Sequence, residues 1–130
     1  HGSMMKYCAN LLATIHNASA AEVMVLGQKA GLDLQRLFDV VTSGAGTSRC
    51  LELRGPMMVA NDYETGKSAS MKIQAKDMGV ISDFIQAHDV PTPLFSAAVE
   101  LNHEAIASGL DDADPACVCR ALEKRAGITR

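Results

Sequence analysis

The chain has 130 residues, 48% of them hydrophobic, which is enough to bury the core of one domain. Twelve basic and 15 acidic residues give a net charge of −3, and no basic cluster is interleaved with aromatic residues, which argues against a nucleic-acid partner. No signal peptide is visible and no apolar run approaches the roughly 18 residues of a membrane span, so we expect a cytoplasmic protein with no membrane partner.

The first predicted element is a long helix from about residue 4 to about residue 30. Residues 1–3, His-Gly-Ser, have the appearance of an expression scar and are set aside. Lys6, Asn10 and Asn17 fall within an arc of about 40° on one face, because a helix advances roughly 100° per residue. The other faces are mostly apolar, which predicts a buried helix whose polar seam meets a partner or a ligand. The alternative is a lysine extended toward solvent beside two hydrogen-bonded amides.

The second predicted helix begins after a clear break. Gly31 favours the left-handed conformation that ends a helix, and Asp33 is a good N-cap for the next one. That helix carries apolar residues at helical spacing and stops at Gly44. The glycine cluster Gly44–Thr47 follows a helix rather than a strand, so we interpret it as a loop between helices and not as a phosphate-binding loop.

The rest of the chain also has the pattern of helices joined by short breaks. A third helix over about residues 48–58 is weakened by Gly55-Pro56. A fourth covers about residues 70–87, a fifth starts at Thr92-Pro93, and Asp114-Pro115 repeats this cap-plus-proline pattern before a last helix. Alternation typical of strands is absent throughout, so the predicted fold class is all-α, with about six helices.

The fourth predicted helix carries a group of charged residues. Lys72, Lys76 and Asp83 share one face, where an anion between the two lysines would offset their repulsion. Asp77 lies on the apolar row of this helix, which we expect to face the core, so its carboxylate needs a donor. That row consists of Ile73, Val80 and Phe84. The alternative is a solvated lysine face with one structural salt bridge.

The cysteines and glycines indicate which cofactor sites the chain lacks. Cys8, Cys50, Cys117 and Cys119 have neither disulfide nor zinc spacing, so we expect buried free thiols and no metal site. No Gly-rich fingerprint follows a strand, so we expect no nucleotide-binding domain within this chain.

Several motifs occur in a characteristic order. They are Lys6–Asn10, similar to K-x-x-x-N; Asn17, Ala21-Glu22 and Lys29–Asp33, similar to N…AE…KAGLD; Lys76-Asp77-Met78, similar to KDL; and Pro91–Leu94, similar to PxPL. Their order resembles the C-terminal domain of the β-hydroxyacid dehydrogenases. This is the group of 3-hydroxyisobutyrate dehydrogenase and tartronate semialdehyde reductase, which is related to 6-phosphogluconate dehydrogenase.

The resemblance implies roles for four residues. Lys6 would be the general acid/base for the hydroxyl of the substrate, and Asn10 would bind the substrate. Lys76, with Asp77 beside it, would help to hold the nicotinamide cofactor, NAD or NADP. One residue departs from the family pattern, because Ala69 stands where an aromatic side chain is usual.

We therefore expect residues 4–130 to form the helical substrate-binding and dimerisation domain of an NAD(P)-dependent dehydrogenase. Its substrate would be a small 3-hydroxy acid or the matching semialdehyde, and the Rossmann domain would lie outside this chain. The chain alone would be inactive, and its apolar helices would associate as a homodimer or larger homo-oligomer. Two alternatives are a non-catalytic helical interaction module that kept the fold, favoured by Ala69, and a stand-alone bundle that binds a small carboxylate.

Overall fold

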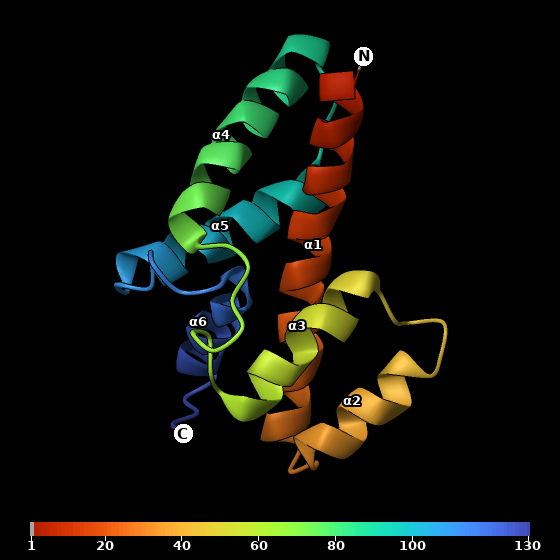
Figure 1. Ribbon diagram of the computed structural model, residues 1–130, viewed down its shortest axis with the longest axis vertical. Helices are drawn as coiled ribbons and strands as arrows, with labels where there is room; N and C mark the ends of the chain where they lie inside the picture. Colours follow the sequence, from red (N-terminus) through yellow and green to blue (C-terminus); the bar gives the residue numbers. More distant parts are fainter. Residues whose placement is uncertain (1) are drawn as a thin grey trace.

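A computed structural model describes residues 2–130, which form six α-helices and one short 3-10 helix (Figure 1). In chain order these are α1 (Gly2–Lys29), α2 (Leu34–Thr42), α3 (Arg49–Ala60), α4 (Met71–His88), α5 (Pro93–Ala107), η1 (Pro115–Cys117) and α6 (Val118–Arg125). No strand occurs within the described residues. The all-α fold class and the long first helix are therefore confirmed.

Helix α1 is the axis of the fold, and every other helix contacts it. Helix α4 lies beside its N-terminal half and α5 crosses near its middle, whereas α2 and α3 lie toward its C-terminal end (Figure 1). The helix starts at Gly2, earlier than predicted, so Gly2 and Ser3 are helical. His1, the remaining residue of the predicted scar, lies outside the described residues.

Two hydrophobic clusters hold these helices together. The larger one joins the C-terminal half of α1 to α3, α5, η1 and α6, and includes Met24, Leu51, Met58 and Leu101. The smaller one places Met78, Ile81 and Phe95 against Tyr7, Leu11 and Ile15, and so attaches α4 and α5 to the N-terminal half of α1. Burial of apolar side chains at both ends fixes the direction of α1 relative to its neighbours.

The prediction of a buried first helix is wrong for its N-terminal half. Met5 is 76% exposed and Leu12 50% exposed, because α4 and α5 cover only one side of this segment. An apolar composition shows that a surface can be buried, but it does not show that a neighbour is present to bury it. This part of α1 therefore presents an open, partly apolar face.

Two of the three predicted N-caps are confirmed, since Asp33 and Asp114 each accept a backbone N–H near the start of a helix. Ser48 and Ser70, which were not predicted as caps, do the same for α3 and α4. Thr92 is an exception, since it precedes α5 but makes no side-chain capping bond.

The predicted weakening of the third helix does not occur, and α3 continues through Pro56 to Ala60. Gly55 has a packing role instead. A Cβ at this position would lie 2.6 Å from Cδ1 of Phe38, which is too close, so only glycine lets the Phe38 ring pack directly against the helix.

The predicted orientation of α4 is also wrong. Ile73 is 57% exposed, Val80 is 41% exposed and Asp77 is exposed, so the row expected to face the core is open to solvent except at Phe84, which is half-buried and packs on Tyr7. The core is reached instead by Met71, Met78 and Ile81. The helix carries two apolar rows, and the sequence alone could not show which of them α1 and α5 would cover.

The other charged side chains of α4 form a solvated face, which was the alternative interpretation. Lys72, Lys76 and Asp83 are all exposed, and Lys72 pairs with Asp112 at 3.2 Å. The expectation of buried thiols holds for Cys117 and Cys119 but is wrong for Cys8, which is exposed. No helix among residues 2–130 is long and apolar enough to cross a membrane, and no cluster of three or more potential metal ligands occurs in the same part of the chain.

Candidate functional site

A small cavity lies where α1, α3 and α4 meet, and Asn10 is one of the residues that line it. Its volume is about 140 Å³. Asn10 and Ala13 line it from α1, Arg54 from α3, Gln74 and Asp77 from α4, and Ala69 from the loop before α4. We call this space the Asn10 cavity. Two of the four residues predicted for the site, Asn10 and Asp77, are thus brought together by helices that are far apart in the sequence.

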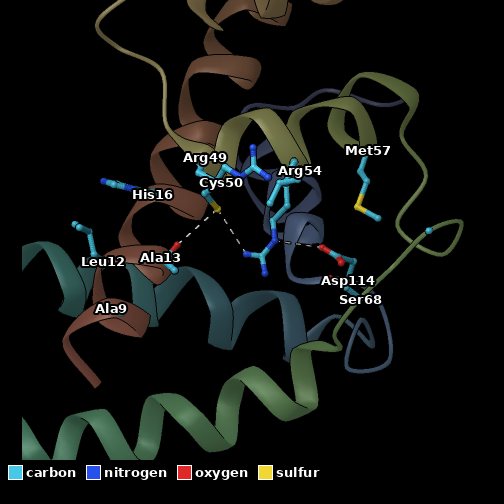
Figure 2. A pocket seen from close by; sticks show the side chains of 12 residues that line it. Ala9, Leu12, Ala13, His16, Arg49, Cys50, Arg54, Met57, Ser68 and Asp114 are labelled. Atoms are coloured by element: carbon cyan, nitrogen blue, oxygen red, sulfur yellow. Dashed lines mark hydrogen bonds and ion pairs between the residues drawn. The ribbon is translucent and has the colours of Figure 1, made fainter. Parts of the chain in front are cut away.

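A second, larger cavity adjoins the first and is shown in Figure 2. Its volume is about 590 Å³, and it is bounded by the open face of α1, by α3 and by the loop that precedes α4. It shares Ala13 and Arg54 with the Asn10 cavity, so the Arg54 side chain separates the two spaces.

Arg54 is the residue of this region that the sequence analysis missed. Its Nε lies 3.7 Å from Oδ1 of Asp114, and its Nη1 lies 3.7 Å from Sγ of Cys50 (Figure 2). The separation from Asp114 is long for a nitrogen–oxygen contact, and the two contacts together use only two of the five guanidinium donors. Arg54 therefore keeps donors available at the boundary of the two cavities. No sequence signal pointed to it, because it is 44 positions from Asn10 and belongs to no motif.

The buried neighbours of Arg54 fix its position. The Asp114 side chain is buried and also accepts a hydrogen bond from the backbone N–H of Ala116 at 2.9 Å. Cys50 donates to the carbonyl of Ala13 at 3.8 Å. Burial raises the pKa of the Cys50 thiol, although the Arg54 guanidinium beside it acts in the opposite direction. The thiol is thus kept neutral and acts as part of the cavity wall rather than as a nucleophile.

Lys6 lies one helical turn before Asn10, on the same side of α1, and is exposed. Tyr7 packs on Phe84 with ring centroids 5.3 Å apart, while Asn10 shares its cavity with Ile73 and Asp77. The two helices are therefore antiparallel, and the exposed row of α4 runs beside the edge of α1 that carries Lys6 and Asn10. Lys6 does not line the cavity itself; it lies one helical turn from Asn10, on the solvent-exposed part of α1.

Asn17 and Lys76 lie away from this cavity. Asn17 is fully buried, and its Nδ2 donates to the carbonyl of Pro115 at 2.8 Å, so it attaches α1 to η1. Lys76 is exposed and does not line the cavity. It lies about 100° around α4 from Asp77, beside Lys72. The predicted polar seam of α1 is therefore divided, with a buried amide at one end and an accessible lysine and amide at the other.

Comparisons with known proteins identify the family. The family described as "NAD-binding of NADP-dependent 3-hydroxyisobutyrate dehydrogenase" matches residues 1–122. The L-threonate dehydrogenase of Escherichia coli K12 is 38% identical over 128 residues, which are 98% of this chain and 41% of that protein. Glyoxylate/succinic semialdehyde reductase 2 of Arabidopsis thaliana is 36% identical over 123 residues, or 95% of this chain and 34% of that protein.

Solved structures agree with this assignment. The crystal structure of a 3-hydroxyisobutyrate dehydrogenase from Salmonella typhimurium superimposes with a TM-score of 0.87 at 36% identity, covering 92% of this chain and 41% of that one. A 3-hydroxyisobutyrate dehydrogenase from Mycobacterium tuberculosis gives a TM-score of 0.81 at 29% identity, covering 93% and 43%. The chain belongs to the 3-hydroxyisobutyrate dehydrogenase family, and it corresponds to the helical C-terminal domain of its members.

Proposed function

We propose that this chain is the substrate-binding domain of an NAD(P)-dependent dehydrogenase that interconverts a small 3-hydroxy acid and its semialdehyde. The observation that carries the proposal is the Asn10 cavity, which is lined by the amide of Asn10 and the guanidinium of Arg54. The exposed lysine Lys6 lies one helical turn before Asn10 on α1. The cavity volume of about 140 Å³ suits a small acid. The names of the relatives, all dehydrogenases or reductases, support the same reaction class.

Each of these side chains has a chemical role in the proposal. Lys6 takes the proton of the reacting hydroxyl during oxidation and returns it during reduction, as a general acid/base one helical turn from Asn10. Asn10 donates from its amide to the hydroxyl or carboxylate oxygen and so orients the acid. Arg54 pairs with the carboxylate through the donors that Asp114 and Cys50 leave free. The site thus gathers donors where an anionic, oxygen-rich substrate needs them.

The residues beside the cavity also fit a nicotinamide cofactor. Exposed Ile73 offers an apolar surface to a flat ring, and Asp77 offers an acceptor to an amide. A bound NAD or NADP would accept or supply the hydride. Lys76, on the outer face of α4, would attract the anionic part of the cofactor. We place the rest of the cofactor site in a Rossmann domain outside this chain, and we expect the chain alone to be inactive.

We also propose that the domain associates as a homodimer or a larger homo-oligomer. The open apolar residues of α1, such as Met5 and Leu12, provide surface that a second subunit or a neighbouring domain would cover. Light scattering at micromolar concentration should give at least twice the monomer mass. A monomer under these conditions would contradict this part of the proposal.

A non-catalytic interaction module is the second candidate, and it is favoured by one observation. Ala69, which replaces the aromatic residue usual in the family, lines the Asn10 cavity and leaves one wall of it without a ring. Loss of a ring that packs on cofactor or substrate would weaken binding even where Lys6 and Asn10 are retained.

The test is a steady-state screen of small 3-hydroxy acids with NAD and with NADP, using the enzyme that contains this chain together with its Rossmann domain. We expect Lys6→Ala to lower activity by about 10²-fold or more. Lys72→Ala is the matched control, since it removes an exposed lysine that pairs with Asp112 away from the cavity, and should leave activity unchanged. If no acid is turned over, the interaction module becomes the better explanation. If Lys6→Ala keeps the wild-type rate, the acid/base role proposed for Lys6 is wrong and Lys6 is a structural lysine.

A further inference from the structure

Gln74 occupies the wall of the Asn10 cavity that belongs to α4, and it is half-buried. No motif or resemblance assigned it a role. Its amide is nevertheless held in one orientation by a hydrogen-bonded chain that reaches into the core. This orientation determines what kind of group the cavity can receive at that wall.

The chain of hydrogen bonds begins at Asn102, which is fully buried on α5. Its Nδ2 donates to the carbonyl of Ala98 at 2.7 Å, and a carbonyl oxygen can only accept. The other atom of the Asn102 amide, Oδ1, must therefore accept, and Nε2 of Gln74 donates to it at 2.7 Å. Exchanging the nitrogen and oxygen of either amide would place two donors or two acceptors face to face.

The Oε1 atom of Gln74 is consequently left as a fixed acceptor. None of the side-chain hydrogen bonds found within residues 2–130 ends on this oxygen. Asp77 lines the same part of the cavity and is also an acceptor when ionised. The cavity thus has two acceptors on the α4 side, whereas on the opposite side Arg54 offers only donors and the Asn10 amide offers both a donor and an acceptor.

We propose that Gln74 is a specificity-determining residue that selects an acid with a second hydroxyl group in addition to the reacting one. The carboxylate pairs with Arg54, and the second hydroxyl donates to Oε1 of Gln74. Asn102 acts through Gln74 as a positioning residue. This inference rests on the proposed function, because it assumes that the Asn10 cavity holds the acid.

The same geometry disfavours two other kinds of acid. An alkyl acid of equal size leaves Oε1 without a partner, and a site built to hydrogen-bond a hydroxyl discriminates against an analogue that lacks it. A dicarboxylic acid places a second negative charge near Asp77 and Gln74, which offer no donor to it. The cavity volume of about 140 Å³ limits the bound acid to a short carbon chain.

The first test compares kcat/KM for 3-hydroxy-2-methylpropanoate and 3-hydroxy-2-(hydroxymethyl)propanoate, which share the carboxylate and a primary 3-hydroxyl that oxidises to a semialdehyde. We expect the wild-type enzyme to prefer the dihydroxy acid by about tenfold or more. Gln74→Met keeps the approximate shape and removes the acceptor, so it should abolish this preference by lowering kcat/KM for the dihydroxy acid. Asn102→Leu should reduce the preference by raising KM for the dihydroxy acid alone. Equal loss on both acids would show a merely structural role and would overturn the proposal.

A second measurement separates this inference from the proposed function. The 130-residue chain, labelled with ¹⁵N, is titrated with each acid while the side-chain amide resonances of Gln74 are followed. We expect them to shift with 3-hydroxy-2-(hydroxymethyl)propanoate and to stay in place with 3-hydroxy-2-methylpropanoate. This result would support the specificity role even if the enzyme oxidised neither acid, which would count against the proposed reaction alone. Equal shifts, or shifts elsewhere only, would refute the role of Gln74 while leaving a dehydrogenase active on both acids intact.

Discussion

Asp112 and Asp114 lie two residues apart in one loop, but their surroundings differ. Replacing either one by alanine removes one negative charge, from an exposed position at Asp112 and from a buried position at Asp114. Asp114 is buried, caps η1 through the Ala116 N–H at 2.9 Å, and lies 3.7 Å from Nε of Arg54. Asp112 pairs with Lys72 at 3.2 Å, but the two side chains are 76% and 66% exposed. We expect Asp114→Ala to destabilise the fold strongly and Asp112→Ala to leave it nearly unchanged.

The size of the effect follows from these contacts. Loss of the cap costs about 1 kcal/mol. The attraction between Asp114 and Arg54 is roughly 4 kcal/mol before desolvation at an effective dielectric constant of about 20, and most of it is offset by burial of the carboxylate, which leaves about 1–2 kcal/mol. Asp114→Ala should therefore lower the free energy of unfolding by about 2–3 kcal/mol, and Asp112→Ala by less than about 0.5 kcal/mol.

A third variant divides the effect of Asp114 into its parts. Asp114→Asn keeps an oxygen that can accept from Ala116 and removes only the charge, so it should cost about 1 kcal/mol less than Asp114→Ala. Urea unfolding followed by circular dichroism measures all three variants, and at roughly 4 °C per kcal/mol the alanine variant should melt about 8–12 °C lower. Equal losses for Asp112→Ala and Asp114→Ala, or for Asp114→Asn and Asp114→Ala, would refute the reasoning.

Three further outcomes are expected. Gly79→Ala should raise the free energy of unfolding by about 0.5–1 kcal/mol in a urea titration, since a Cβ there meets nothing within 4 Å and alanine favours a helix. Gly55→Ala should instead lower it by about 1 kcal/mol, because overpacking against Phe38 outweighs the same helix preference; a gain would contradict the close packing. Burial raises the pKa of Cys117 to about 12 and that of Cys119 to about 11 from the ordinary 9.0. The stability contributed by the neutral thiols is therefore complete below pH 9, falls as pH rises above 9, and is fully lost once pH has risen through about 11 to 12. From pH 8 to pH 10 the two thiols should together cost roughly 3 kcal/mol, Cys119→Ala should remove about half of that loss, and equal stability at both pH values would show that the thiols are not buried in this way.

Local sequence determined the helices, because their boundaries depend on residues close together in the chain. Gly31 in the left-handed conformation ends α1, and Asp33 accepts the Gln35 N–H to begin α2. Asp114 with Pro115 likewise starts the last helical segment. Such caps involve contacts within about four residues, so side-chain chemistry and spacing suffice to predict them. The same local spacing placed Lys6 and Asn10 on one side of a helix and supplied the motifs that led to the family.

Contacts between distant segments decided what those helices cover. The spacing of Ile73, Asp77 and Val80 is that of a row facing the core. In the structure the row of Met78 and Ile81 is buried instead, because Phe95 and the N-terminal half of α1 pack against it. The sequence could not reveal this choice, since both rows are apolar enough and the free energy of burial depends on which neighbour is present.

The candidate site shows the same division. Asn10 was recognisable from its motif, whereas Arg54 and Gln74 became part of the site only when α3 and α4 were placed against α1. The orientation of Gln74 depends further on Asn102, 28 residues away. The sequence by itself thus determined the helices and the motif residues, and the tertiary structure decided which of their side chains meet, because hydrogen bonds and burial act between atoms that only folding brings into contact.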